Sequence, residues 1–120
     1  MSQRRIVIAD DNSDSAEMLE VLLRLRGHEV RCAADGNAAM QFFHQDRPDA
    51  MLVDITMPGI DGREVARRVR SEDAGRSVLL VAISGWARPS DVEESLASGF
   101  DHHLVKPVDM ETLERLCAAE

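Results

Sequence analysis

Short apolar runs alternate with amphipathic segments along the whole chain. The runs are mostly continuous rather than alternating in polarity, and they are rich in Val and Ile. That composition is typical of strands covered on both faces of a sheet. The pattern predicts five strands, at residues 5–9, 29–33, 50–53, 78–83 and 103–105.

The segments between these runs carry helix start and stop signals. Capping residues 12–15 precede the first segment and Gly27 ends it, while Pro89 and Gly99 fit the first turn and the end of the fourth. The predicted helices lie at residues 16–26, 36–46, 62–71, 89–99, and from 107 to 116 or beyond. Strict alternation with short links implies right-handed crossovers, and therefore an α/β fold with a parallel sheet between helices.

Composition places the chain among globular proteins of one domain, residues 1–120. The formal net charge of -8 argues against binding nucleic acid or anionic membranes. No stretch approaches the roughly 18 apolar residues of a membrane span, and the first residues lack the features of a signal peptide. We therefore expect a cytoplasmic location and free thiols at Cys32 and Cys117.

Polar side chains stand at four of the predicted strand ends. Asp10 and Asp11 follow the first strand, Asp54 the third, Ser84 the fourth and Lys106 the fifth. In an open parallel sheet the carboxyl ends of the strands gather along one edge, where such folds place their sites. An acid at the end of a buried strand is costly unless something uses its charge.

Three of these side chains are carboxylates that would repel one another if they converged. A hard divalent cation relieves that repulsion, and Mg²⁺ suits a site with few carboxylates. Taken singly, each residue also has an ordinary structural interpretation. Asp10 and Asp11 would cap a helix, Asp54 would be a loop acid, Ser84 a turn residue and Lys106 a surface cation.

Together these positions resemble the receiver domain of bacterial two-component response regulators. The matching stretches are IVIADDN, MLVDITMPGIDG, VAISGWA and FDHHLVKPVD, and the resemblance covers essentially the whole chain. The last stretch looks like the receivers of hybrid sensor kinases and of some stand-alone regulators. The resemblance implies a flavodoxin-like (βα)5 fold with strand order 2-1-3-4-5.

The resemblance also assigns the acids. Asp54 matches the phosphoacceptor, the nucleophile toward a phosphohistidine or a small phosphodonor. Asp11, Asp54 and the backbone carbonyl of Thr56 match Mg²⁺ ligands, and Asp10 matches the acid that holds the ion through water.

The remaining matches concern the switch. Lys106 matches the lysine that pairs with the acceptor and then with the phosphoryl group, and Ser84 matches the switch hydroxyl. His103 stands where the family usually has Tyr or Phe, and the chain has no tyrosine. Trp86, two residues beyond Ser84, is expected to shield the phosphoryl group from water, or else to serve a partner interface.

The expected function is a phosphorylation-driven switch that catalyses only its own phosphorylation and dephosphorylation. A histidine kinase or phosphotransfer protein would be the donor, and an effector protein or domain would read the face of the fourth helix, fifth strand and fifth helix. Met18, Leu22 and Leu25 on the first helix would either dock the donor or belong to the core.

Three alternatives compete with this interpretation. The first is an interaction module with the same fold that is never phosphorylated, although the complete acid and lysine set argues against it. The second is a hydrolase acting through an aspartyl phosphate, which usually has a second acid where Thr56 stands. The third is a flavodoxin-like cofactor binder, which would need a phosphate cradle after the first strand instead of acids. The oligomeric state is not predicted by the sequence.

Overall fold

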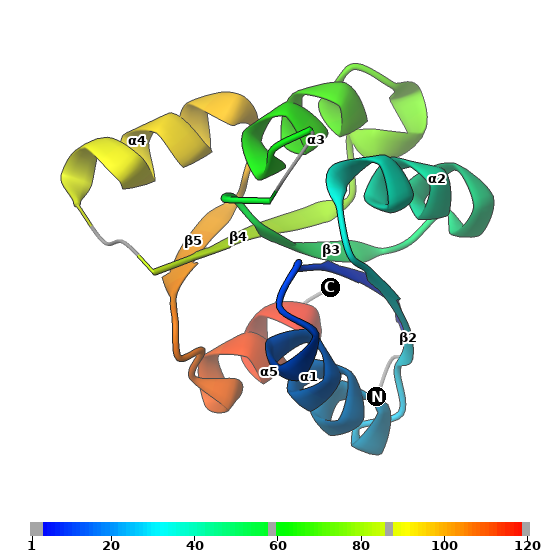
Figure 1. Ribbon diagram of the computed structural model, residues 1–120. Helices are drawn as coiled ribbons and strands as arrows, with labels where there is room; N and C mark the ends of the chain where they lie inside the picture. Colours follow the sequence, from blue (N-terminus) through cyan, green and yellow to red (C-terminus); the bar gives the residue numbers. More distant parts are fainter. Residues whose placement is uncertain (1–3, 58–59, 86–87, 119–120) are drawn as a thin grey trace.

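The computed structural model describes residues 4–57, 60–85 and 88–118, and it contains one parallel sheet between two helical layers (Figure 1). The strands are β1 (Arg5–Ala9), β2 (Glu29–Ala33), β3 (Ala50–Asp54), β4 (Leu79–Ser84) and β5 (His102–Val105). Their order is β2-β1-β3-β4-β5, as the resemblance implied.

Helices alternate with the strands along the chain. They are α1 (Ser13–Leu25), α2 (Gly36–Asp46), α3 (Gly62–Arg70), α4 (Pro89–Ser98) and α5 (Met110–Ala118), with a short 3-10 helix η1 (Asp73–Gly75) before β4. In Figure 1, α1 and α5 cover one face of the sheet, and α2, α3 and α4 lie on the other.

Successive strand residues enter different halves of the core. In β1, Ile6 and Ile8 pack with Leu23 of α1 on one face, whereas Val7 packs with Phe43 of α2 on the other. All of these side chains are at most 2% exposed. Burial on both faces explains why the strands read as continuous apolar runs.

Side-chain caps set several of the helix starts. Asn12 accepts a hydrogen bond from the backbone N–H of Ser15, so α1 begins three residues earlier than predicted. Asp35 and Asp61 cap α2 and α3 in the same way.

Two strands also extend one residue further than predicted. Asp54 pairs with Ile83 and Ser84 pairs with Val105 in the parallel registers. Both polar residues are therefore the last residues of their strands, held by the sheet itself rather than by the loops that follow.

Candidate functional site

Four chemically active side chains meet at the carboxyl edge of the sheet. Asp10 directly follows β1, Asp54 ends β3, Ser84 ends β4 and Lys106 directly follows β5. Strands β1, β3, β4 and β5 are parallel neighbours in that order, so their carboxyl ends lie along one edge. The sheet topology thus brings together residues that are far apart in the sequence. The most distant pair, Asp10 and Lys106, is separated by 96 positions.

Asp54 is a buried carboxylate with a partner on each oxygen. Its side-chain Oδ1 accepts hydrogen bonds from the backbone N–H of Thr56 at 2.8 Å and from the Thr56 hydroxyl at 2.7 Å. Its Oδ2 accepts a hydrogen bond from the Lys106 ammonium at 3.0 Å. Burial raises the pKa of Asp54, but the Thr56 and Lys106 hydrogen bonds outweigh it and leave the pKa below its ordinary value. The carboxylate is therefore ionised at neutral pH.

Lys106 joins two acids. Its Nζ also lies 3.1 Å from Oδ2 of Asp10, whose Oδ1 accepts a hydrogen bond from the backbone N–H of Asn12 at 2.9 Å. Burial lowers the pKa of Lys106, but its hydrogen bonds to Asp54 and Asp10 raise it above its ordinary value overall. For Asp10, burial dominates and raises the pKa, and the nearby charge of Asp54 adds to that effect.

The acids form a cluster that suits a hard cation. One ligand atom from each of Asp10, Asp11 and Asp54 lies within 4.8 Å of the others. Asp11 is exposed, whereas Asp10 and Asp54 are each only 4% exposed. With three carboxylates and the single ammonium of Lys106, the cluster has an excess of two negative charges when all three are ionised. Oxygen ligands with that charge excess fit Mg²⁺.

Thr56 occupies the position from which a backbone carbonyl ligand is predicted. Its N–H and hydroxyl both point at Asp54, which the sequence did not indicate. The role of the Thr56 carbonyl as a ligand stays a prediction.

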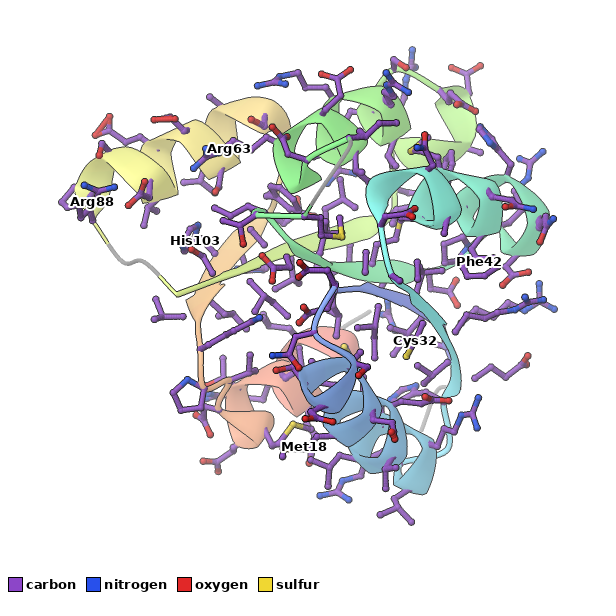
Figure 2. The ribbon with its side chains drawn as sticks, viewed as in Figure 1. Met18, Cys32, Phe42, Arg63, Arg88 and His103 are labelled. Atoms are coloured by element: carbon purple, nitrogen blue, oxygen red, sulfur yellow. The ribbon has the colours of Figure 1, made fainter. Side chains whose placement is uncertain are left out.

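The two switch candidates differ in where they lie. Ser84 is fully buried, and its backbone carbonyl accepts a hydrogen bond from the Lys106 N–H at 2.8 Å, so it adjoins the acid site. His103 is half-buried, and its Nδ1 lies 2.9 Å from the hydroxyl of Ser95 on α4. Figure 2 shows the His103 side chain beside β5 on the side of α4. Trp86 lies outside the described residues.

Three residues near the site were missed by sequence reasoning. Ser95 and Ser98 are buried on α4, and their spacing of three residues places them on one helix face. Gly62 begins α3 directly against the backbone of Asp54. The serine spacing is visible in the sequence, but only the packing reveals what each of these residues meets.

The first helix presents an apolar surface next to the site. Met18 is 65% exposed and Leu25 is 71% exposed, so the alternative that they belong to the core is wrong, whereas Leu22 is half-buried. A groove of about 420 Å³ runs from Met18 to Asp10 and Lys106. Figure 2 shows Met18 on the outer surface of α1. Among the helices of the described residues, none has the length and apolar character that a membrane span requires.

Comparisons with known proteins agree with this geometry. The sequence model of the response regulator receiver domain matches residues 6–118. An uncharacterised 14.6 kDa protein of Leptolyngbya boryana is 33% identical over 116 residues, which cover 97% of this chain and 88% of that protein.

Solved structures point the same way. A putative response regulator from Chloroflexus aurantiacus superposes with a TM-score of 0.89 at 30% identity, covering 98% of this chain and all of that one. The receiver domain of a sensor histidine kinase from Pseudomonas aeruginosa, with magnesium in its active site cleft, gives 0.86 at 31% identity and covers 96% and 94% of the two chains. The acid cluster, the lysine and the fold therefore have one common explanation: the chain belongs to the response regulator receiver domain family of two-component signalling.

Proposed function

We propose that this chain is a phosphoacceptor signalling switch in which Asp54 receives a phosphoryl group from a histidine kinase or a histidine phosphotransfer protein. The observation that carries the proposal is the state of Asp54. It is buried, ionised, hydrogen-bonded to Lys106 and adjacent to two further acids. An ion pair with a purely structural role would need only one acid for the single lysine. The two further acids of the cluster are not needed for that role.

The proposed reaction is a displacement at phosphorus. One carboxylate oxygen of Asp54 forms a bond to phosphorus as the phosphorus–nitrogen bond of the donor histidine breaks, and the departing imidazole takes a proton. Lys106 is already within hydrogen-bonding distance of Asp54, so its ammonium is placed to stabilise the negative charge on the phosphoryl oxygens. The Ser84 hydroxyl, at the end of β4, is assigned to the same phosphoryl group.

Asp11, Asp54 and the Thr56 carbonyl are proposed to hold Mg²⁺, with Asp10 contacting it through water. The bound ion would neutralise charge on the phosphoryl oxygens. The magnesium in the active site cleft of the Pseudomonas receiver domain supports the same ion here. The chain's own carboxylates supply the charge excess that attracts it.

The partners follow from the surfaces around the site. The exposed side of α1 and the groove from Met18 to Lys106 are proposed to dock the phosphodonor, which must bring its phosphohistidine to Asp54. The face of α4, β5 and α5 is proposed to signal to an effector. We further propose that residues 1–120 act as one receiver domain in the cytoplasm and catalyse only their own phosphorylation and dephosphorylation.

The test is phosphorylation by acetyl phosphate with Mg²⁺, followed by intact mass. We expect one phosphoryl adduct on the wild-type chain, none when EDTA removes the metal, and none on Asp54→Ala. Asp73→Ala is the matched control, because Asp73 is an exposed acid on η1.

An adduct that survives Asp54→Ala would place the acceptor elsewhere. No adduct on a folded wild-type chain would favour the interaction module that is never phosphorylated. Continued release of phosphate from a small phosphate ester would favour the hydrolase.

A further inference from the structure

Helix α4 is held to the sheet with less buried apolar surface than the other helices. The buried residues of α4 are Ser95 and Ser98, and its Leu96 is 48% exposed. Each other helix buries larger apolar side chains, among them Leu19 and Leu23 of α1, Met40 and Phe43 of α2, Val65 and Val69 of α3, and Leu113 of α5. Burial of apolar area contributes about 25 cal/mol per Å², so α4 is the helix that undocks at the lowest cost.

The two ends of α4 are fastened unequally. At the carboxyl end, Arg70 Nε donates a hydrogen bond to the Gly99 carbonyl at 2.9 Å, and Phe100 is buried. At the amino end, no side chain among the described residues makes a capping hydrogen bond to the first turn. Displacement of α4 would therefore begin at its amino end and in its middle.

Polar contacts from two neighbouring elements hold this freer part. Arg63 of α3 reaches the Asp91 carbonyl and Glu94, each at 3.4 Å, which is long for a hydrogen bond. The contact between His103 Nδ1 and Ser95 Oγ is 2.9 Å, and Ser95 is fully buried. Because it is shorter and more buried, the His103–Ser95 hydrogen bond holds α4 more strongly than the Arg63 contacts do. Figure 2 shows both Arg63 and His103 close to α4.

His103 is mechanically connected to the acid site through β5. It pairs with Ala82 in the register, two residues before the pair of Ser84 with Val105. The next residue, Lys106, donates its N–H to the Ser84 carbonyl and its side chain to Asp54. A shift of Ser84 or Lys106 toward a phosphoryl group would act on the same short strand that carries His103.

We propose that the His103–Ser95 hydrogen bond is a latch of the resting protein: it docks α4 on β5 while Asp54 is unmodified, and it is given up when Asp54 is phosphorylated. This inference rests on the proposed function. The resting and phosphorylated conformations are the two states of one equilibrium. A contact that exists only in the resting state therefore makes phosphorylation less favourable by the free energy that the contact contributes. His103 is then a positioning residue, and it acts here through a hydrogen bond that Phe could not make.

The first experiment is hydrogen exchange of the α4 amides in the unmodified protein. Ser95→Ala should exchange about 3- to 10-fold faster than Ser98→Ala, as expected for the loss of one net hydrogen bond. Ser98 is the matched control, because it is buried on the same helix face but bonds the Glu94 carbonyl of its own helix. Both substitutions replace Ser with Ala in the same helix, so they raise the intrinsic helix propensity equally. In a protein that already carries His103→Phe, adding Ser95→Ala should not raise the exchange rate of the α4 amides further. His102→Phe alone should leave that rate at the wild-type value.

The second experiment repeats the exchange with excess acetyl phosphate and Mg²⁺, with intact mass confirming the adduct. In the wild type, phosphorylation should raise the exchange rate of the α4 amides to about the rate seen in unmodified Ser95→Ala. In Ser95→Ala itself, phosphorylation should raise that rate little further. Equal exchange in the two serine variants, or slow α4 exchange in a phosphorylated wild type, would overturn the latch. Absence of any adduct would overturn the proposed function instead, and the serine comparison would still decide whether the hydrogen bond docks α4.

Discussion

Gly62, the first residue of α3, lies directly against the backbone of Asp54. A Cβ atom at position 62 would be 2.6 Å from the Asp54 carbonyl oxygen and 2.6 Å from the Cα of Ile55. Atoms at that separation overlap, so α3 approaches the proposed phosphoacceptor this closely only because residue 62 has no side chain. The position of Asp54 therefore depends on a helix that contributes no chemistry to the site.

Replacing Gly62 with alanine should push α3 away from β3. We expect Gly62→Ala to lower the free energy of unfolding by about 1–3 kcal/mol, the usual cost of overpacking, and to slow phosphorylation of Asp54. Urea unfolding followed by circular dichroism measures the first effect. Gly85→Ala is the control, because a Cβ there meets no atom of the described residues within 4 Å, and its stability should change by less than about 0.5 kcal/mol. Equal losses in the two variants would contradict the close-approach argument.

Asp10→Asn should stabilise the metal-free protein at neutral pH. Burial and the charge of Asp54 raise the pKa of Asp10 in the fold, so the folded state favours the protonated acid. That contribution is fully present below the ordinary pKa of 3.8 and is lost as the pH rises through the folded value, which leaves a net cost at pH 7.

A neutral amide of the same shape removes that cost while keeping an acceptor for the Asn12 N–H. We expect the free energy of unfolding to rise in EDTA, together with weaker Mg²⁺ binding by calorimetry. Asp73→Asn, at an exposed acid, should change neither quantity. A loss of stability in Asp10→Asn would mean that its ion pair with Lys106 outweighs burial and repulsion.

Magnesium should stabilise the fold by mass action. At a free concentration 100 times its dissociation constant, the free energy of unfolding should rise by about 2.7 kcal/mol over a potassium control of equal ionic strength. Asp11→Asn should show a much smaller rise, because it removes one proposed ligand. Asp11 is exposed, so the metal-free stability of the variant should stay within about 0.5 kcal/mol of wild type. The same rise in both proteins would place the ion elsewhere.

Lys106→Met should destabilise the protein at neutral pH, because it leaves Asp10 and Asp54 without their shared cation. The acids are 2% and 5% exposed at the side chain, so we expect a loss of about 3 kcal/mol, measured by urea unfolding. The pKa of Lys106 is raised in the fold, so its stabilising contribution is present below the ordinary value of 10.5 and is lost only as the pH rises through the folded value.

Lys106→Arg is the companion variant, since it keeps the charge but replaces a compact ammonium with a planar fork. It should recover most of the stability lost in Lys106→Met while still slowing phosphorylation by acetyl phosphate. Full phosphorylation activity in Lys106→Arg would show that charge alone is sufficient at this position.

Much of the fold could be predicted because its signals are local. Continuous apolar runs located all five strands, and capping residues located the helices to within a few positions. Several differences arise where pairing or capping extends an element, whereas α5 begins three residues later than predicted, at Met110. Asp54 and Ser84 belong to their strands because neighbouring strands still pair with them, and α1 starts early because Asn12 caps it. Helix η1 was not predicted.

The sequence by itself determined which residues reach the site. Parallel strands deliver their carboxyl ends to one edge, so the acids, Ser84 and Lys106 had to meet once the strands were recognised. Only the tertiary structure decided how these residues and their neighbours are held: Thr56 bonding Asp54, Gly62 packing against the Asp54 backbone, and His103 bonding Ser95 on α4. Strand ends are set by local patterns, whereas these contacts depend on the depth to which helices pack on the sheet and on side-chain rotamers, which no local pattern encodes.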